Sequence, residues 1–154
     1  MSKIEVLAPL DGTVVDLESV PDEVFAQKMA GDGVAIDPSG RVAVAPVTGD
    51  LVKLFPGGHA FGISTGEGVE LIVHIGLDTV ELKGEGFENI ATEGQVVQAG
   101  TPIVSFDRAT VERRGKVMLS PVVSSGAGTI VRRASGIVRA GRDVLFVLEV
   151  SDTP

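Results

Sequence analysis

The stretch "HAFGISTGEGVELIVH" (His59–His74) decides the fold. Apolar and polar residues alternate on both sides of a glycine-rich centre, which is typical of two β-strands joined by a tight turn. A two-residue loop at Gly66-Glu67 would place glycine at the first loop position, as a type II′ turn requires. In that register His59 is expected directly opposite His74, and these are the two histidines of the chain.

This register also predicts which side chains share a face. Phe61 would lie opposite Ile72, and because side chains alternate along a strand, both would share a face with the histidines. Directly opposed Cβ atoms on one face lie about 4.5–5.5 Å apart, so the two imidazoles could meet one small group. A three-residue loop would shift the pairing by one residue and leave the histidines diagonal.

Outside this hairpin, short β-branched segments with period-2 alternation dominate, and they predict an all-β antiparallel sandwich or distorted barrel. The expected strands are Lys3–Ala8, Gly12–Asp16, Val34–Pro38, Arg41–Ala45, Gly49–Leu54, Gly62–Thr65, Val69–Ile75, Gln95–Val97, Ile103–Phe106, Val117–Pro121, Gly128–Arg132 and Val144–Glu149.

One or two short helices interrupt the strands. Pro21 opens the first helical pattern and Gly31 ends it. Asp107 is the expected N-cap of the second, which ends before Gly115.

Weak internal repeats are visible. "APLDGTVV" (Ala8–Val15) resembles "APVTGDLV" (Ala45–Val52), and "VQAGTPIVSF" (Val97–Phe106) resembles "VRAGRDVLFV" (Val138–Val147). Such repeats predict a pseudo-symmetric barrel built from similar hairpins. No segment reads as a linker, so residues 1–154 are expected to form a single domain.

The composition excludes several classes of function. The formal net charge is −8, from 21 acidic and 13 basic residues, which disfavours nucleic acid and favours a basic protein partner, unless the charge serves only solubility. There are no cysteines, so disulfides, thiolate nucleophiles and cysteine zinc sites are excluded. The chain lacks a signal-peptide core and an apolar run of about 18 residues, so we expect a cytoplasmic protein that does not span the membrane.

Two facing imidazoles suit two kinds of chemistry. Neutral histidines bind metals, but zinc takes about four ligands and the sequence has no third histidine. Alternatively, one histidine can accept a phosphoryl group as a nucleophile while the other hydrogen-bonds the phosphate oxygens. Both could also be ordinary half-buried histidines.

A longer pattern around this hairpin resembles a known family. "VELIVHIGLDTVELKGEGF" (Val69–Phe87) closely resembles the active-site signature of the glucose-type enzyme IIA of the bacterial phosphoenolpyruvate-dependent sugar phosphotransferase system. The segments Ala8–Gly40 and Val44–Thr65 resemble the N-terminal region of that family and the region that carries its second histidine. Weaker resemblance continues through "SPVV" (Ser120–Val123), so nearly the whole chain is covered.

The resemblance implies a function. In this family a histidine accepts phosphate from the carrier protein HPr and passes it to a cysteine of a IIB domain, which phosphorylates the sugar during uptake. By motif position His74 is the phosphorylated residue and His59 is its partner. No cofactor is required, although a partner carboxylate could complete a zinc site on the two histidines.

The resemblance also implies a partner-binding surface. The matching acidic positions are Asp32, Asp78 and Glu81, and the matching apolar contact ring is Val34, Phe55, Phe61 and Ile72. There are two departures. Gly57 stands where the family often has a threonine that hydrogen-bonds the second histidine, and Ile72 stands where it often has phenylalanine.

Other readings remain open. A biotinyl or lipoyl carrier would need a lysine at a hairpin tip, whereas Lys28 of "QKM" lies in an expected helix. A regulatory protein that binds transporters or metabolic enzymes would coexist with phosphotransfer. The sequence leaves the sugar undecided, and its Met1 start favours a separate polypeptide over a domain of a fused permease.

Overall fold

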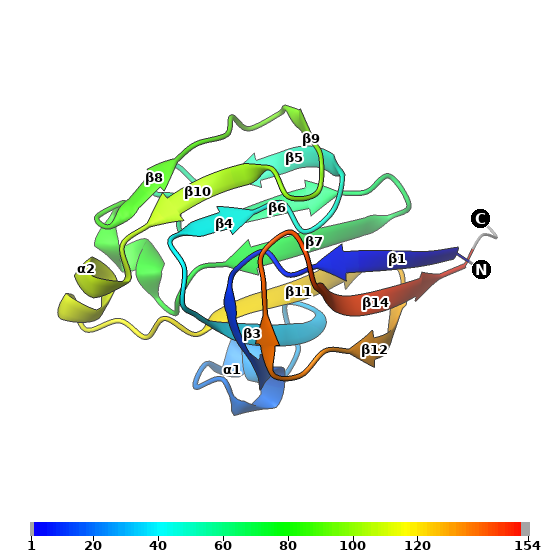
Figure 1. The fold of residues 1–154 in the computed structure, drawn as a ribbon, viewed down its shortest axis with the longest axis horizontal. Helices are drawn as coiled ribbons and strands as arrows, with labels where there is room; N and C mark the ends of the chain where they lie inside the picture. Colours follow the sequence, from blue (N-terminus) through cyan, green and yellow to red (C-terminus); the bar gives the residue numbers. More distant parts are fainter. Residues whose placement is uncertain (1, 152–154) are drawn as a thin grey trace.

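Antiparallel sheets account for most of the computed structural model, which describes residues 2–151 (Figure 1). The strands are β1 (Ser2–Leu7), β2 (Gly12–Asp16), β3 (Asp32–Pro38), β4 (Val42–Val44), β5 (Gly49–Leu54), β6 (Ala60–Ser64), β7 (Val69–His74), β8 (Phe87–Asn89), β9 (Val96–Val97), β10 (Pro102–Phe106), β11 (Ser120–Gly126), β12 (Thr129–Arg133), β13 (Ile137–Val138) and β14 (Val144–Val150). The helices are α1 (Glu23–Ala26), α2 (Arg108–Arg113) and the 3-10 turns η1 (Leu17–Ser19) and η2 (Thr79–Leu82). The predicted all-β class is confirmed.

The strands form one large sheet and two small ones. The eight-stranded sheet has the order β13-β2-β3-β11-β7-β6-β5-β9, and the three-stranded sheets have the orders β1-β14-β12 and β4-β10-β8. The β6–β7 hairpin therefore lies near the middle of the large sheet, where β7 also pairs with β11.

The two halves of the large sheet repeat each other around the β11–β7 pair. Val138 pairs with Gly12 at one edge, and Val97 pairs with Gly49 at the other. These four residues occupy equivalent places in the two pairs of sequence repeats. The repeats therefore form equivalent strand pairs, as the predicted pseudo-symmetry implies, but the paired strands are distant in the chain, so the predicted hairpins are wrong for these repeats.

The connections between the two small sheets follow the same symmetry. Leu7 donates its backbone N–H to the carbonyl of Pro46 (2.9 Å), and Val44 donates to the carbonyl of Pro9 (2.8 Å). The two "Ala-Pro" turns, at Ala8-Pro9 and Ala45-Pro46, are thus joined by a reciprocal pair of backbone hydrogen bonds.

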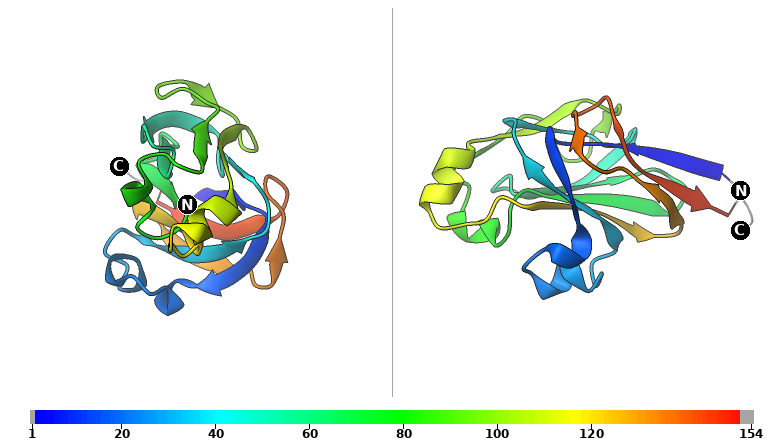
Figure 2. Two further views of the ribbon diagram at one scale, coloured as in Figure 1. Left: turned by 90° about the vertical axis from the view of Figure 1, so that its left-hand side faces the viewer. Right: turned by 60° about the horizontal axis from the view of Figure 1, so that its bottom comes forward.

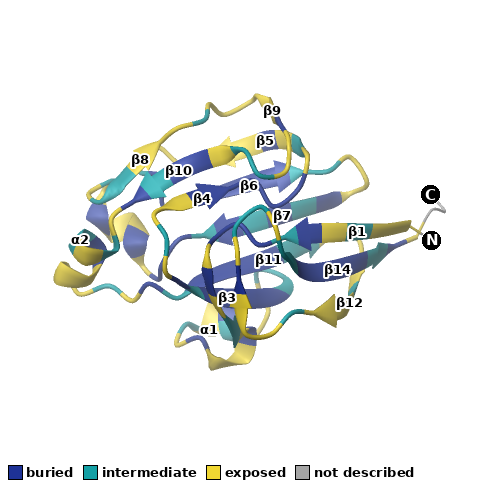
Figure 3. Cartoon of the chain, in the orientation of Figure 1, coloured by how far each residue is buried: buried dark blue, intermediate teal, exposed yellow. Residues whose placement is uncertain are grey.

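Alternation along β7 separates the core from the outer face of the large sheet. Val69, Leu71 and Val73 are buried in the main core, whereas Ile72 and His74 are half-buried on the opposite face. Figure 3 shows this banding of buried and intermediate positions on β7. The outer face carries the histidine because the strand has a side-chain period of two.

A small second core covers part of the outer face. It forms where η1 and α1 fold back over the sheet, and Figure 2 shows α1 on one side of the molecule. Its buried members are Leu17, Val20, Phe25, Ala35, Leu77 and Val123. The N-cap of α1 is Asp22, whose side chain accepts a hydrogen bond from Val24 N (3.0 Å), so the helix begins at Glu23, two residues after the predicted proline opening.

The second helix follows its prediction closely. Asp107 caps α2 by accepting a hydrogen bond from Ala109 N (3.1 Å). Within residues 2–151, no helix is long and apolar enough to cross a membrane. The strands β8 and β13 have only three and two residues and were not predicted, since a period cannot be read from so few positions.

Candidate functional site: a histidine pair at the end of the β6–β7 hairpin

The register of the β6–β7 hairpin differs from the prediction by one residue. Ala60, rather than His59, lies opposite His74. Thr65 donates its backbone N–H to the carbonyl of Val69 (3.0 Å), so the loop contains three residues. Gly66 and Gly68 have φ angles of +87° and +81°. Because glycine at position 68 also adopts a left-handed conformation, it belongs to the loop and not to the strand.

The two imidazoles nevertheless meet, in the diagonal arrangement. His59 lies just before β6, and its carbonyl accepts a hydrogen bond from Ile75 N (2.7 Å). The centroids of the His59 and His74 rings are 5.5 Å apart, with the planes at 67°. The predicted proximity of the two histidines is confirmed, although the predicted direct opposition is wrong.

A hydrogen bond fixes the ring of His74. Its Nδ1 lies 2.6 Å from the carbonyl oxygen of Gly76. A carbonyl can only accept, so Nδ1 carries the proton and donates it. In a neutral imidazole the other nitrogen, Nε2, then holds the free lone pair. Gly76 can present its carbonyl in this way because it adopts a left-handed conformation, with φ of +77°.

A buried network holds Gly76 in turn. The Ser120 hydroxyl accepts a hydrogen bond from Gly76 N (3.0 Å) and donates one to the carbonyl of Met118 (2.7 Å). Thr79 donates its hydroxyl to the carbonyl of Ile75 (2.7 Å). Ser120 and Thr79 are both buried, so these bonds are shielded from water.

Each imidazole also packs against one phenylalanine. Phe25 of α1 lies against His74 with ring centroids 5.3 Å apart, and Phe55 lies against His59 with centroids 4.8 Å apart. The four rings form a row in which the two histidines are central. Sequence reasoning did not assign a role to Phe25, because α1 reaches His74 only through the fold.

Burial lowers the pKa of both histidines. For His74 the effect of burial exceeds the opposing effects of the Gly76 carbonyl, Asp22 and Asp78, each of which raises the pKa. For His59, burial and then the neighbouring His74 lower the pKa. Both rings are therefore neutral at pH 7, as a nitrogen nucleophile must be.

The predicted acidic interface residues occupy different places. Asp78 is exposed near His74 at the start of η2. Glu81 is exposed and forms an ion pair with Lys116. Asp32 is paired with Arg133 of β12 (2.5 Å). Asp32 also forms an ion pair with Lys28 in the turn after α1 (3.5 Å), so two basic side chains already neutralise it.

The predicted apolar ring is only partly correct. Ile72 is half-buried on the outer face that carries His74, and Phe55 is 36% exposed beside His59. Val34 and Phe61, each 1% exposed, instead belong to the main core, so their prediction as surface contacts is wrong. For Phe61 the reason is the hairpin register, since a shift of one residue moves it to the inner face, whereas Val34 pairs with the buried Val122 of β11.

Other exposed apolar side chains lie on α1, which contacts His74 through Phe25, and on η2, and they were not predicted. Val24 is 47% exposed and Met29 is 70% exposed on α1 and its following turn, and Val80 is 57% exposed on η2. Short helical turns give no periodicity from which a surface position could be read. The sequence pattern "HIG" contains Gly76, but it does not show that the Gly76 carbonyl orients the His74 ring, because this depends on the left-handed backbone conformation of Gly76.

The metal and carrier-domain alternatives gain little support. Across residues 2–151, no group of three or more His, Cys, Asp or Glu side chains is arranged to hold a metal ion. The two histidines alone would need ligands from a partner. Lys28 lies in the turn after α1, with φ of +61°, and not at the tip of a β-hairpin.

Comparison with known proteins identifies the family. Residues 4–129 match the model of the phosphoenolpyruvate-dependent sugar phosphotransferase system, EIIA 1. The chain is 47% identical over 149 residues to the glucose-specific EIIA component of Haemophilus influenzae, covering 96% of this chain and 90% of that protein. It is 43% identical over 146 residues to an N-acetylglucosamine-specific EIICBA component from Klebsiella pneumoniae, covering 93% of this chain and 22% of that protein.

The fold agrees with this assignment. The structure of the glucose permease IIA from Mycoplasma capricolum superposes with a TM-score of 0.92 at 44% sequence identity, covering 97% of both chains. An all-β scaffold that carries two neutral, neighbouring histidines suits transfer through a phosphohistidine. The chain therefore belongs to the EIIA 1 family of the phosphoenolpyruvate-dependent sugar phosphotransferase system and is a phosphoryl carrier in sugar uptake.

Proposed function

We propose that His74 carries the phosphoryl group and that its Nε2 is the attacking atom. The observation that supports this most directly is the 2.6 Å contact between His74 Nδ1 and the Gly76 carbonyl. It directs the proton to Nδ1 and leaves the lone pair on Nε2. The lowered pKa of His74 keeps that lone pair available at neutral pH.

The transfer needs no cofactor. Nε2 of His74 attacks the phosphorus of a phosphohistidine on the donor, the donor's N–P bond breaks, and a new N–P bond forms on His74. In the second step a cysteine thiolate of the acceptor attacks the same phosphorus, and the imidazole leaves. His59 donates a hydrogen bond to a phosphate oxygen in both steps, because its ring lies 5.5 Å from the ring of His74.

The donor is HPr and the acceptor is the IIB domain of a sugar permease, both meeting the chain in the cytoplasm. The exposed apolar side chains of Val24, Met29, Phe55 and Val80 provide the contact surface. The exposed Asp78 and the net charge of −8 steer basic partners toward it. Val34 and Phe61 have no part in this contact, because both are buried in the main core.

The sugar belongs to the class transported by the relatives, glucose or N-acetylglucosamine. The carrier itself does not touch the sugar, so the permease that accepts phosphate decides between them. Transfer to purified IIB domains of the two specificities would separate these possibilities.

The test of the phosphoryl carrier is intact mass after incubation with phosphoenolpyruvate, enzyme I and HPr. Wild type should gain one acid-labile phosphate and His74→Ala should gain none. His59→Gln should still accept phosphate but pass it to IIB far more slowly. The assignment of His74 is refuted if His74→Ala still becomes phosphorylated.

A second role is suggested by the same pair of rings. Two neutral imidazoles 5.5 Å apart could share a zinc ion if a regulatory partner supplied a carboxylate. Zinc titration of the chain alone and with a candidate partner tests this. Only the mixture should bind tightly, and His59→Gln should abolish that binding.

A further inference from the structure

The ring of His59 lacks the support that His74 has. Gly57 stands two residues before it, so no side chain is present there to donate or accept a hydrogen bond. In the part of the chain that the structure describes, the His59 ring makes no hydrogen bond with any residue. A ring that must direct one nitrogen at a phosphate therefore needs another constraint.

Ring packing supplies that constraint. The Phe55 ring lies 4.8 Å from the His59 ring, tilted by 47°, and the His74 ring lies 5.5 Å from the same imidazole. His59 is thus held between two rings, and it is only 7% exposed. Rotation of the imidazole about its side-chain bonds would break one of these contacts, each of which has a preferred geometry.

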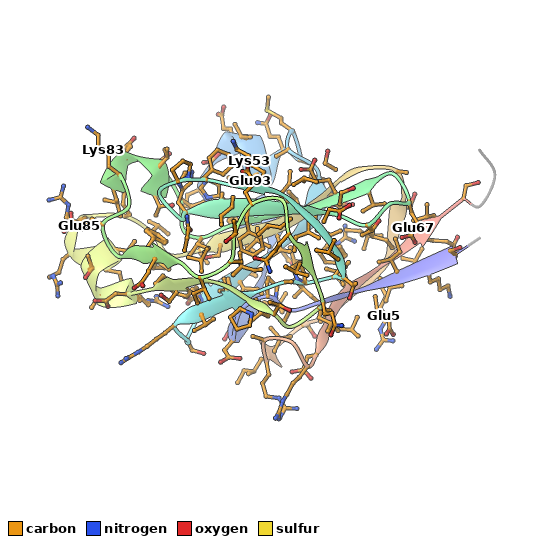
Figure 4. The ribbon with its side chains drawn as sticks, turned by 90° about the horizontal axis from the view of Figure 1, so that it is seen from above. Glu5, Lys53, Glu67, Lys83, Glu85 and Glu93 are labelled. Carbon is orange, nitrogen blue, oxygen red and sulfur yellow. The ribbon has the colours of Figure 1, made fainter. Side chains whose placement is uncertain are left out.

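Phe55 is itself 36% exposed and needs a contact of its own. The ammonium group of Lys53 lies over its ring, 5.0 Å from the centroid. Lys53 and Phe55 are two residues apart in extended chain and so share a face. Figure 4 shows Lys53 near Glu93, whose carboxylate accepts a hydrogen bond from Leu54 N (2.8 Å), so this acid is bound to the backbone.

We infer that Phe55 is the positioning residue for His59, in place of a hydrogen-bonding side chain, and that Lys53 holds the Phe55 ring through a cation–π contact. The functional part of this inference rests on the proposed role of His59 in phosphoryl transfer. The structural part does not, because it concerns the orientation of the imidazole before any phosphate is present.

The structure also indicates how the missing hydrogen bond could be restored. A Cβ atom added at Gly57 would lie 3.6 Å from His59 Nδ1. A serine hydroxyl at this position is one bond longer and can reach that nitrogen. The nearest obstacle is the backbone nitrogen of Gly84, at 3.3 Å from the added Cβ, which requires a shift of a few tenths of an ångström.

The first experiment measures the orientation directly. With two histidines in the chain, nitrogen-detected NMR gives one set of ring signals for each. In Phe55→Leu, the ring signals of His59 should move from their wild-type positions and show a higher pKa, because the imidazole becomes less buried, while the signals of His74 stay unchanged. Phe55→Tyr should keep the wild-type signals. Val52→Ala is the matched control, since Val52 is 45% exposed on the same strand.

The second experiment measures transfer from the phosphorylated chain to IIB. Phe55→Leu should lower the rate by about 2–10-fold, the range that aromatic pair energies imply. Lys53→Met should lower it by about 2–5-fold, as expected for an exposed cation–π contact. The double variant Phe55→Leu/Gly57→Ser should recover to within about twofold of wild type, because a hydrogen bond is comparable in strength to the lost ring contact.

The inference is overturned if Phe55→Leu matches Val52→Ala in both the His59 signals and the transfer rate. It is also overturned if transfer falls but the His59 signals are unchanged, because Phe55 would then act only as a partner contact. Failure of wild type to accept phosphate would instead refute the proposed function and leave the NMR result standing.

Discussion

Removal of the buried hydroxyl of Ser120 should lower the free energy of unfolding strongly for so small a group. It is 0% exposed, accepts from Gly76 N and donates to the carbonyl of Met118. Replacing it with alanine leaves two buried backbone groups without a partner. Each such group destabilises a protein by about 1–3 kcal/mol, so Ser120→Ala should lower the free energy of unfolding by about 2–6 kcal/mol. That is a large share of a typical total of roughly 5–15 kcal/mol.

Urea unfolding measures this loss. With a slope of about 2 kcal/mol per molar urea, the midpoint should fall by about 1–3 M. The matched control is Ser124→Ala on the same strand, which should change stability by no more than about 0.5 kcal/mol because Ser124 is half-buried.

The variant should also affect the chemistry, because Ser120 holds the residue whose carbonyl orients His74. The ring nitrogen signals of His74 should shift toward a tautomer mixture, and phosphate acceptance should slow. A stability loss equal to that of Ser124→Ala would refute the reasoning, since it would show that the buried groups find other partners without the hydroxyl.

Three further predictions concern the histidines, Gly76 and the ion pair of Asp32. The free energy of unfolding should fall as the pH drops below about 6.5, because the pKa values of both histidines are lowered in the folded chain and the unfolded chain therefore binds protons first. The loss should be at most about 1.4 kcal/mol per pH unit for each histidine. Replacing both histidines with asparagine should remove this pH dependence between about pH 7.5 and 5.5. Gly76→Ala should lower the free energy of unfolding by about 2–3 kcal/mol, which is more than Gly94→Ala should. Both glycines have a positive φ, but a Cβ added at Gly76 would lie 2.7 Å from the Thr79 methyl group, whereas one added at Gly94 would meet nothing within 4 Å. Asp32→Asn should lower stability by less than about 1 kcal/mol, and by less again in 1 M salt, because its ion pair with Arg133 is partly exposed; an unchanged loss at high salt would contradict this.

Patterns that extend over many residues were readable from the sequence. Alternation predicted most strands, and the bounds of β2 and β5 match the prediction at both ends. The capping residue Asp107 was recognised because its side chain acts on its own helix. The sequence repeats could be recognised because the equivalent turns in the two halves of the large sheet contain glycine or proline at the same positions. The signature around His74 was long enough to indicate the family.

The hairpin register could not be decided from the sequence. Gly66 and Gly68 allow either a two-residue or a three-residue loop, and the choice depends on how the chain turns back onto β6. That single choice placed Phe61 in the core and set the histidines diagonally. Ile72 shares the outer face with His74 in either register, because the two residues are two positions apart on the same strand.

By itself, the sequence determined the all-β class, the approximate strand positions, the presence of a histidine pair on one hairpin, and the family. These follow from local periodicity and from a long motif, which need no knowledge of distant contacts. Only the tertiary structure decided which groups act on the histidines. Phe25 of α1 contacts the His74 ring and Ser120 of β11 holds Gly76, and such contacts between residues distant in the chain are fixed by packing. The protonation of His74 likewise follows from burial and from the Gly76 carbonyl, which exist only once the chain is folded.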